Sequence, residues 1–273
     1  EEAWGALNIK TRQYINVAQL ILSHAILIFG ALTMIIPFIW MLSTSLKSAA
    51  GVFQYPPEWI PRPIMWGNYV ELLDVIPFAR YFTNTIYVSV YVTMLQLITC
   101  SMAAYSFGRL RFPGRDTLFI LYLATLMIPI QVRIVPNFIL MRHIGWLDTH
   151  KALIVPAAFI PFGTFLLRQF FMSLPRELEH AVKIDGCGYT RIFFSIILPL
   201  SKPALATLAT YTFMGQWNDF LWPLIVISRE EMKTLTVGLR SMQGMYYTNW
   251  PMLMAGTPTS MKCPNMLLQR KVT

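Results

Sequence analysis

The residues best suited to an interaction with another molecule lie together between Leu174 and Gly186. This stretch reads Leu-Pro-Arg-Glu-Leu-Glu-His-Ala-Val-Lys-Ile-Asp-Gly. Pro175 suits the first turn of a helix, and acidic side chains in that turn, here Glu177 and Glu179, are stabilised by the positive helix N-terminus. Gly186 is able to adopt the left-handed conformation that ends a helix. The pattern therefore predicts a short amphipathic helix followed by a turn.

A second helix is expected directly after this turn. It covers Tyr189–Ile197 and stops at Leu198-Pro199. The first helix has one small apolar face, formed by Leu178, Ala181 and Val182 at positions i, i+3 and i+4. Two interpretations fit this amphipathic element: an interfacial helix that lies on a membrane surface, or a docking helix for a cytoplasmic partner.

Few polar side chains interrupt the apolar parts of the chain, and these few are candidates for a pathway or gate. Asp219 is the one acidic residue inside an apolar span, and such residues usually face a cavity or a partner. A salt bridge that fixes helix packing, for example with Arg133, is the simpler interpretation. A solute pathway or outer gate is the alternative, to which Trp217 and Trp222 could contribute stacking surfaces. The candidate residues are Asn84, Gln131, Arg133, Trp217, Asn218 and Asp219.

The sequence offers no catalytic constellation. The apolar spans contain no paired carboxylates, His–Glu motif or nucleophile group at one depth, which argues against a membrane-embedded enzyme. No Gly-x-x-x-x-Gly-Lys-[Ser/Thr] phosphate loop occurs, so no nucleotide site of that type is expected on this chain. The cysteines, Cys100, Cys187 and Cys263, are odd in number and lack metal-type spacing. We therefore expect no catalytic residue, no metal site and no disulfide framework.

The composition indicates an integral membrane protein. Hydrophobic residues make up 55% of the 273 residues and charged residues only 13%, with a mean hydropathy of +0.50. Soluble domains carry about a quarter charged residues, so this chain cannot cover a water-facing surface of ordinary size. The net charge of +9 is found in short clusters between apolar runs. It therefore indicates membrane topology rather than nucleic-acid binding, and disorder is excluded.

Five apolar windows are predicted to be transmembrane helices, each of which needs about 20 residues. They are Val17–Leu42, Tyr81–Gly108, a stretch after Asp116 that continues through Pro129 to Leu140, Ala152–Leu167 and Pro203–Ser228. A sixth span between Arg240 and Lys262 has weak support, because prolines, glycines and hydroxyl groups interrupt its apolar run. The predicted fold class is an all-α, polytopic membrane helix bundle with five spans plus a doubtful sixth.

Basic residues in the short loops predict the orientation of these spans. The N-terminal segment carries Lys10 and Arg12, and the 109–116 loop carries Arg109, Arg111 and Arg115. The 168–202 loop carries five basic residues, whereas residues 43–80 hold three basic and three acidic ones. The N-terminus and the 109–116 and 168–202 loops are therefore expected in the cytoplasm.

The stretch from Glu179 to Pro199 resembles the cytoplasmic loop of ABC importer permeases. The loop of that family has Glu-Ala-Ala, then Asp-Gly, then Ile-x-Leu-Pro. Asp185-Gly186 and Ile196-Ile-Leu-Pro199 match it at the family's spacing. Further segments of this chain resemble the carbohydrate branch of that family, which includes maltose-type subunits. They are Arg168-Gln-Phe-Phe, Pro175-Arg-Glu-Leu-Glu179, Leu200-Ser-Lys-Pro203, Met127-Ile-Pro-Ile-Gln131 and Trp217-Asn-Asp-Phe-Leu-Trp-Pro223.

Two departures from the family pattern accompany this resemblance. His180-Ala-Val182 stands where the family has Glu-Ala-Ala, and Glu179, one position earlier, points about 100° away on a helix. The segment 256–273 does not look like the family's last span and basic tail. The residues that the resemblance assigns to ATPase coupling are Glu179, His180, Ala181, Val182, Asp185, Gly186, Leu198 and Pro199.

The resemblance implies a permease subunit without an ATPase site, in the bacterial or archaeal cytoplasmic (inner) membrane. It would form half of the pathway for a sugar or related solute. Its domains would be a cytoplasmic N-terminal segment (1–16), a transmembrane domain (17–255) with a cytoplasmic coupling loop (172–200), and an atypical C-terminal tail (256–273).

The resemblance also implies what this chain would bind. No cofactor is expected on it, because ATP and Mg²⁺ would be held by partner subunits. The expected partners are a second permease subunit, two ATP-binding subunits, an extracytoplasmic solute-binding protein and membrane lipid, with no nucleic acid. A secondary transporter or channel is the alternative function, and it predicts internal hydropathy repeats, of which no clear example is present.

Overall fold

The computed structural model describes residues 2–184, 186–243 and 248–257, with side chains from residue 19 onward except Ala181. Within these ranges the regular elements are helices, which confirms the all-α prediction. The chain divides into two compact units. One contains residues 1–72 and part of the C-terminal region, and the other contains the segment 73–244.

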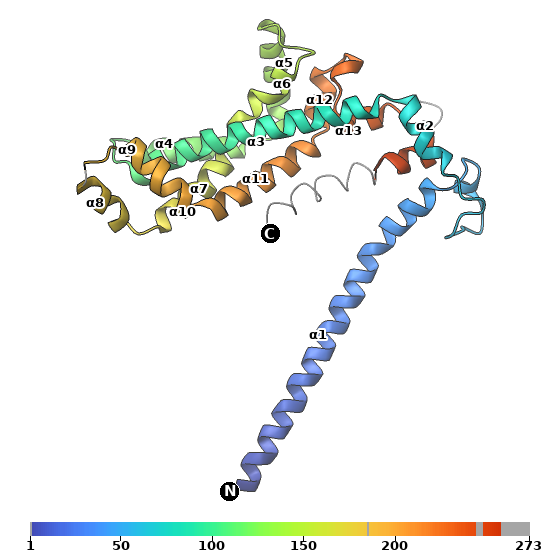
Figure 1. Cartoon of the computed structure of the whole chain (residues 1–273), viewed down its shortest axis with the longest axis horizontal. Coiled ribbons are helices and arrows are strands. Elements are labelled where there is room, and N and C mark those ends of the chain that lie inside the picture. The colour runs from blue at the N-terminus through green and yellow to red at the C-terminus, as the bar shows by residue number, and fades with distance from the viewer. Residues whose placement is uncertain (1, 185, 244–247, 258–273) are drawn as a thin grey trace. The chain divides into compact units, whose positions relative to one another are not determined.

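The first unit is built on one long helix, α1 (Glu2–Ser45) (Figure 1). Its Gln19–Ser45 part is 27 residues long and highly apolar, so it is a candidate membrane span. Most of its apolar side chains are exposed, as a lipid-facing helix requires. The predicted window Val17–Leu42 lies within α1, so this window is confirmed as helical.

The segment after α1 is held to the end of that helix by polar contacts. It contains η1 (Gly51–Phe53) and the start of α2 (Gly67–Val75). Asn68 Nδ2 donates hydrogen bonds to the carbonyls of Ser45 and Lys47, at 2.8 and 2.9 Å. These bonds satisfy carbonyl groups that have no partner within the helix.

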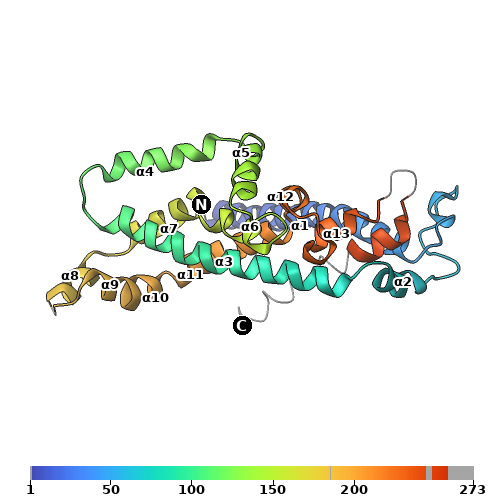
Figure 2. The same ribbon diagram turned by 90° about the horizontal axis from the view of Figure 1, so that it is seen from above.

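The second unit is organised around α3 (Phe78–Arg109), a 32-residue helix that packs against α7 (Pro161–Ser173) and α11 (Lys202–Trp217) (Figure 2). The other elements of this unit are α4 (Arg115–Ala124), η2 (Thr125–Met127), α5 (Ile130–His143), α6 (His150–Ile154), η3 (Pro156–Ala158), α8 (Glu177–Ile184), α9 (Tyr189–Ile192), η4 (Phe193–Ile197), α10 (Leu198–Leu200), α12 (Leu221–Val226), η5 (Glu230–Met232) and α13 (Leu235–Arg240).

The core between α3, α7 and α11 depends on close helix contact. Cys100, Leu167, Phe171 and Leu208 are all almost fully buried there. A Cβ atom at Gly163 would lie 2.9 Å from a methyl group of Leu208 and 3.0 Å from Cys100 Sγ. Glycine at this position therefore lets the three helices approach one another as closely as they do.

Two sharp bends interrupt the helices of the second unit, one within the predicted third span and one just before the predicted fifth span. Helices 115–127 and 130–143 meet at 98°, and helices 189–200 and 202–217 meet at 77°. The first bend is at Ile128, whose backbone is extended because Pro129 follows it. By length and composition, three described helices could cross a membrane, or up to five if each bent pair is one span.

The predicted fifth span, Pro203–Ser228, is not a single helix. Helix α11 ends at Trp217, and α12 begins only at Leu221. The Asp219 carboxylate lies against the backbone amides of Phe220, Leu221 and Trp222, where it stabilises the start of a new helix. This local polar contact therefore accompanies a break in the helix, although the apolar sequence pattern is continuous there.

The doubtful sixth span lies only partly within the described residues. Residues 250–257 form a helix. Residues 244–247 of that window, and the atypical tail from 258 onward, lie outside the described part of the chain.

Candidate functional site

Helix α8 and its turn have the predicted local structure. The helix covers Glu177–Ile184, and Gly186 has a positive φ of 77°. The amide of Gly186 donates to the carbonyl of Lys183 at 3.0 Å, and that of Cys187 donates to Val182 at 3.2 Å. These bonds cap the helix end in the way that a left-handed glycine allows. The candidate Asp185 lies outside the described residues, as does the side chain of Ala181.

Glu179 points into the protein, where it forms a buried ion pair with Arg109 at the end of α3. The Arg109 Nε and Glu179 Oε1 atoms are 3.1 Å apart, and the two side chains are only 2% and 8% exposed. Arg109 also donates from Nη2 to the carbonyl of Leu174 at 2.6 Å. His180 and Leu178, in contrast, are exposed. The pair fastens the start of α8 to α3, a contact that the sequence did not indicate.

The helical run after the turn is anchored in the core of the second unit. Ile192, Phe193 and Ile197 are buried together with α7 side chains. The Tyr105 hydroxyl of α3 donates to the carbonyl of Tyr189 at 3.3 Å. The run passes through the candidates Leu198 and Pro199 to Leu200, slightly further than predicted. The 172–200 segment is therefore fixed to the transmembrane helices at both of its ends.

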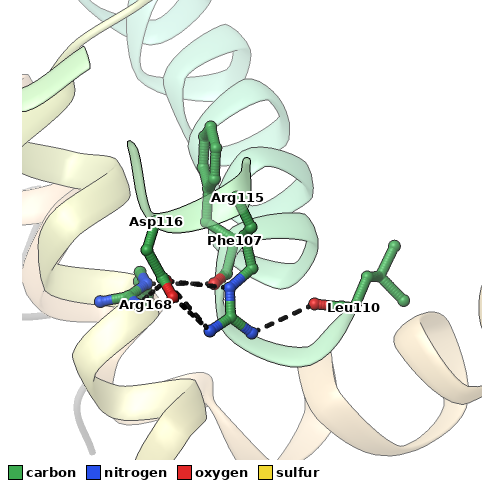
Figure 3. Close-up of polar contacts among 5 residues, drawn as sticks. All are labelled: Phe107, Leu110, Arg115, Asp116 and Arg168. Carbon is green, nitrogen blue, oxygen red and sulfur yellow. Dashed lines mark hydrogen bonds and ion pairs between the residues drawn. The ribbon is translucent and has the colours of Figure 1, made fainter. Parts of the chain in front are cut away.

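A second polar cluster joins the end of α3 and the start of α4 to Arg168 of α7 (Figure 3). Asp116 accepts from Arg115 at 3.0 Å and lies 3.5 Å from Nη2 of Arg168. Arg168 Nε donates to the carbonyl of Phe107, and Arg115 Nη1 donates to that of Leu110. The arginines thereby satisfy carbonyls at the C-terminus of α3 while they pair with a carboxylate on α4.

A cavity of about 300 Å³ lies between α3, α5, α11 and the broken segments around η3 and α12. Its polar lining side chains are Gln96, Thr125, Arg133, Asn137, Gln216 and Asp219. Its apolar lining includes Trp222 and residues of the 153–161 segment. Amides, a guanidinium and a carboxylate beside an indole ring suit the hydroxyl groups and apolar faces of a polyol or sugar.

Gln96 connects the wall of this cavity to two neighbouring elements. It is 3% exposed in the middle of α3. Its Nε2 donates to the carbonyl of Ala157 at 2.6 Å, and its Oε1 accepts from Thr212 at 2.7 Å. Thr99 Oγ1 donates to the carbonyl of Ala158 at 2.6 Å. These bonds satisfy carbonyls that are freed where the helix breaks before Pro161.

The structure brings only some of the predicted pathway residues together. Arg133 and Asp219 line the cavity, but no ion pair joins them among the described residues. Gln131 does not line it, Asn218 is exposed, and Trp217 is buried against Phe213. Sequence reasoning missed Gln96, Asn137 and Gln216, although each is an amide within an apolar window and could have been found by that signal.

Asn84 lies elsewhere, in a polar connection at the other end of α3. Its Nδ2 donates to the carbonyls of Glu231 and Lys233, both at 2.9 Å. Nearby, Asp148 Oδ1 accepts from the backbone amides of Arg229 at 2.8 Å and Ser228 at 2.5 Å. These two hydrogen bonds hold the pKa of Asp148 below its usual value, because they stabilise the charged carboxylate. Asn84 and Asp148 thus fix the 228–234 segment.

No group of three or more His, Cys, Asp or Glu side chains within the described ranges is arranged to hold a metal ion. The polar side chains that line the cavity offer hydrogen bonding and charge recognition.

The family model and the sequence relatives that match this chain indicate the same family. Residues 96–260 match the model for "Binding-protein-dependent transport system inner membrane component". The sn-glycerol-3-phosphate transport system permease protein UgpE of Pectobacterium atrosepticum is 34% identical over 257 residues, which is 91% of each chain. The arabinooligosaccharides transport system permease protein AraQ of Halalkalibacterium halodurans is 39% identical over 198 residues, or 72% of this chain and 71% of AraQ.

A solved structure agrees with these sequence relatives. It is a bacterial ABC transporter involved in the import of the acidic polysaccharide alginate, and one of its chains is similar with a TM-score of 0.81 and 25% identity. The similarity covers 93% of this chain and 96% of that one.

Proposed function

This chain belongs to the inner-membrane components of binding-protein-dependent transport systems, and from that premise we propose how it passes solute and receives energy. It is a permease subunit of an ABC importer of the carbohydrate type in the inner membrane. ATP is hydrolysed by separate subunits in this family, so the chain is not an enzyme. A secondary transporter or channel is thereby excluded.

We propose that α8 and the following turn dock on an ATPase subunit and that α3 carries the resulting movement. The observation that carries this proposal is the buried Arg109–Glu179 ion pair, which fixes the docking helix to the longest helix of the unit. The exposed Leu178 and His180 remain available for the ATPase. For the whole assembly we propose one partner permease, two ATP-binding subunits that hold ATP and Mg²⁺, and a solute-binding protein.

Helix α3 connects the docking site to the cavity. Arg109 is the last residue of α3, and Gln96 lies about 20 Å from it along the helix, at 1.5 Å per residue. Gln96 contacts both the broken 156–161 segment and α11. A packed helix moves as a rigid body rather than deforming continuously. We propose that displacement of α8 tilts α3 and thereby alters the cavity that Gln96 helps to line.

The test of the docking proposal is the substitution Glu179→Gln. It leaves Arg109 buried without a counter-charge, which costs about 3–5 kcal/mol. We expect the transporter to lose solute-stimulated ATP hydrolysis, and less ATPase to co-purify. Glu177→Gln, an exposed acid on the same helix, is the matched control and should behave as wild type.

A second variant separates positioning from a general folding defect. Replacing both partners with methionine removes the charges together and leaves no unpaired ion, so ATPase association should return in part. Wild-type coupling in the Glu179→Gln variant would contradict the proposal.

We propose that the cavity forms part of the pathway for a sugar or a related polyol. Support comes from its mixed lining and from relatives whose names specify glycerol phosphate and arabinooligosaccharides. Asn137→Ala should reduce solute uptake several-fold while ATPase association is unchanged, because the removed amide faces the cavity and not the docking helix. Gln131→Ala, an exposed amide near the same bend, is the control. An equal loss of uptake in both variants would argue against this pathway.

A further inference from the structure

A second cavity lies at the junction of the 109–116 loop with the segment that precedes α8. Its volume is about 540 Å³. It is lined by Arg111, Phe112, Gly114, Arg115, Asp116, Thr117 and Arg176. Three guanidinium groups and one carboxylate thus face a single concave surface, which is an arrangement suited to an anion.

The charges of this cavity are not balanced by the protein itself. Asp116 is paired with Arg115 and also lies within 3.5 Å of Arg168, so its charge is already neutralised (Figure 3). Arg111 and Arg176 are exposed, and their side chains have no ionic or hydrogen-bond partner within the part of the chain that the structure describes. Two guanidinium groups therefore remain for a ligand.

The surroundings of the cavity favour an amphipathic ligand. Loops rich in arginine lie at the cytoplasmic membrane surface, and this loop follows the end of the span α3. Phe112 is 37% exposed at the rim, and Leu118 and Leu121 of the adjoining helix α4 are 52% and 60% exposed. An exposed apolar surface therefore begins next to the unpaired guanidinium groups.

We propose that this cavity binds the phosphate headgroup of an anionic phospholipid from the cytoplasmic leaflet. The headgroup phosphate contacts Arg111 and Arg176, and the acyl chains lie along the exposed face of α4. A bound lipid connects the loop after α3 to the residue just before α8. The proposal does not depend on the docking role of α8, because it concerns only the cavity and the membrane beside it.

The expected strength follows from the charges involved. Each basic residue at an anionic membrane surface contributes about 1 kcal/mol, which corresponds to roughly 5-fold in affinity. Loss of both unpaired guanidinium groups should therefore weaken lipid binding about 30-fold.

The test uses the complete transporter, purified in mild detergent and titrated with phosphatidylglycerol or phosphatidylcholine, with retained lipid measured by native mass spectrometry. We compare Arg111→Gln/Arg176→Gln with Arg142→Gln/Arg229→Gln, which removes the same charge from two other exposed positions. We expect selective loss of phosphatidylglycerol from the first variant only. Arg111→Lys/Arg176→Lys keeps both positive charges and should retain most of the binding.

Three results would overturn the proposal. Equal phosphatidylglycerol retention in both glutamine variants would show that the cavity does not hold the lipid. Displacement of the lipid by millimolar inorganic phosphate would indicate a site for a free anion. Unchanged lipid retention together with loss of co-purified ATPase from the Arg111→Gln/Arg176→Gln variant would assign the two arginines to a protein contact.

Discussion

Among single residues, the position of Glu179 changes the interpretation most. The family resemblance assigns Glu179 to ATPase coupling, yet its carboxylate is 3.1 Å from Arg109 Nε and almost fully buried. A buried ion pair gives little net stability, but removal of one partner is costly. Glu179 therefore positions the docking helix from within, while His180 lies on the exposed side.

Asp148 gives a residue-scale prediction with a pH dependence. Its φ of 57° is left-handed, which asparagine also tolerates, so Asp148→Asn removes the charge with little backbone cost. Because hydrogen bonds from the amides of Arg229 and Ser228 lower the pKa of Asp148 in the folded protein, its stabilising effect is present above the unfolded value of about 3.9. That effect is lost as the pH falls through the lower, folded value.

We therefore expect the Asp148→Asn variant to be less stable than wild type at pH 6 to 7 and the difference to shrink below about pH 4. Thermal unfolding of the purified transporter across this pH range measures it. A difference in stability that grows toward acid pH would contradict the assigned contact.

At the scale of elements, the turn between α8 and α9 requires glycine because of its backbone conformation and not because a side chain would collide with other atoms. Gly186 has a φ of 77°, and an added Cβ atom would meet no atom within 4 Å. A side chain there would be strained by about 1–2 kcal/mol through the backbone alone. The turn directs the chain from the docking helix into the run that is buried against α7.

Gly186→Val should therefore weaken ATPase association and reduce transport, whereas Gly186→Asn should be close to wild type because asparagine enters the left-handed region more readily. Co-purification of the ATPase at equal permease yield is the measurement. Equal defects in the two variants would mean that the surface of the turn, rather than its conformation, is what the partner requires.

At the scale of the whole chain, orientation in the membrane is the property that connects both proposals. Arginines after α3 and in the 168–202 loop predict that the docking helix and the basic cavity share the cytoplasmic side. The 48–78 segment is predicted on the opposite side.

Labelling with a membrane-impermeant thiol reagent tests this orientation. In a background without Cys100, Cys187 and Cys263, a Glu58→Cys variant should be labelled in intact cells, and a Lys183→Cys variant only after the cells are permeabilised. Labelling of the Lys183→Cys variant from outside would show that the orientation is the opposite of the predicted one and would contradict the docking proposal.

The sequence by itself determined the features that depend on local composition and short periodicity. The all-helical membrane class follows from long apolar windows, and the turn at Gly186 follows from a glycine after an amphipathic helix. The family likeness of the 179–199 segment was also visible, because its motif residues are close together in the chain.

Only the tertiary structure decided which side chains meet across large sequence separations. Glu179 and Arg109 pair because α8 folds back on the end of α3, and Gln96 reaches Ala157 and Thr212 because three helices pack around it. Hydropathy also predicted one continuous span where the chain bends by 98°, and another where α11 ends at Trp217 and α12 begins only at Leu221. A buried polar group seeks whatever partner the packing brings within hydrogen-bond distance, and that partner is not encoded in the local sequence around it.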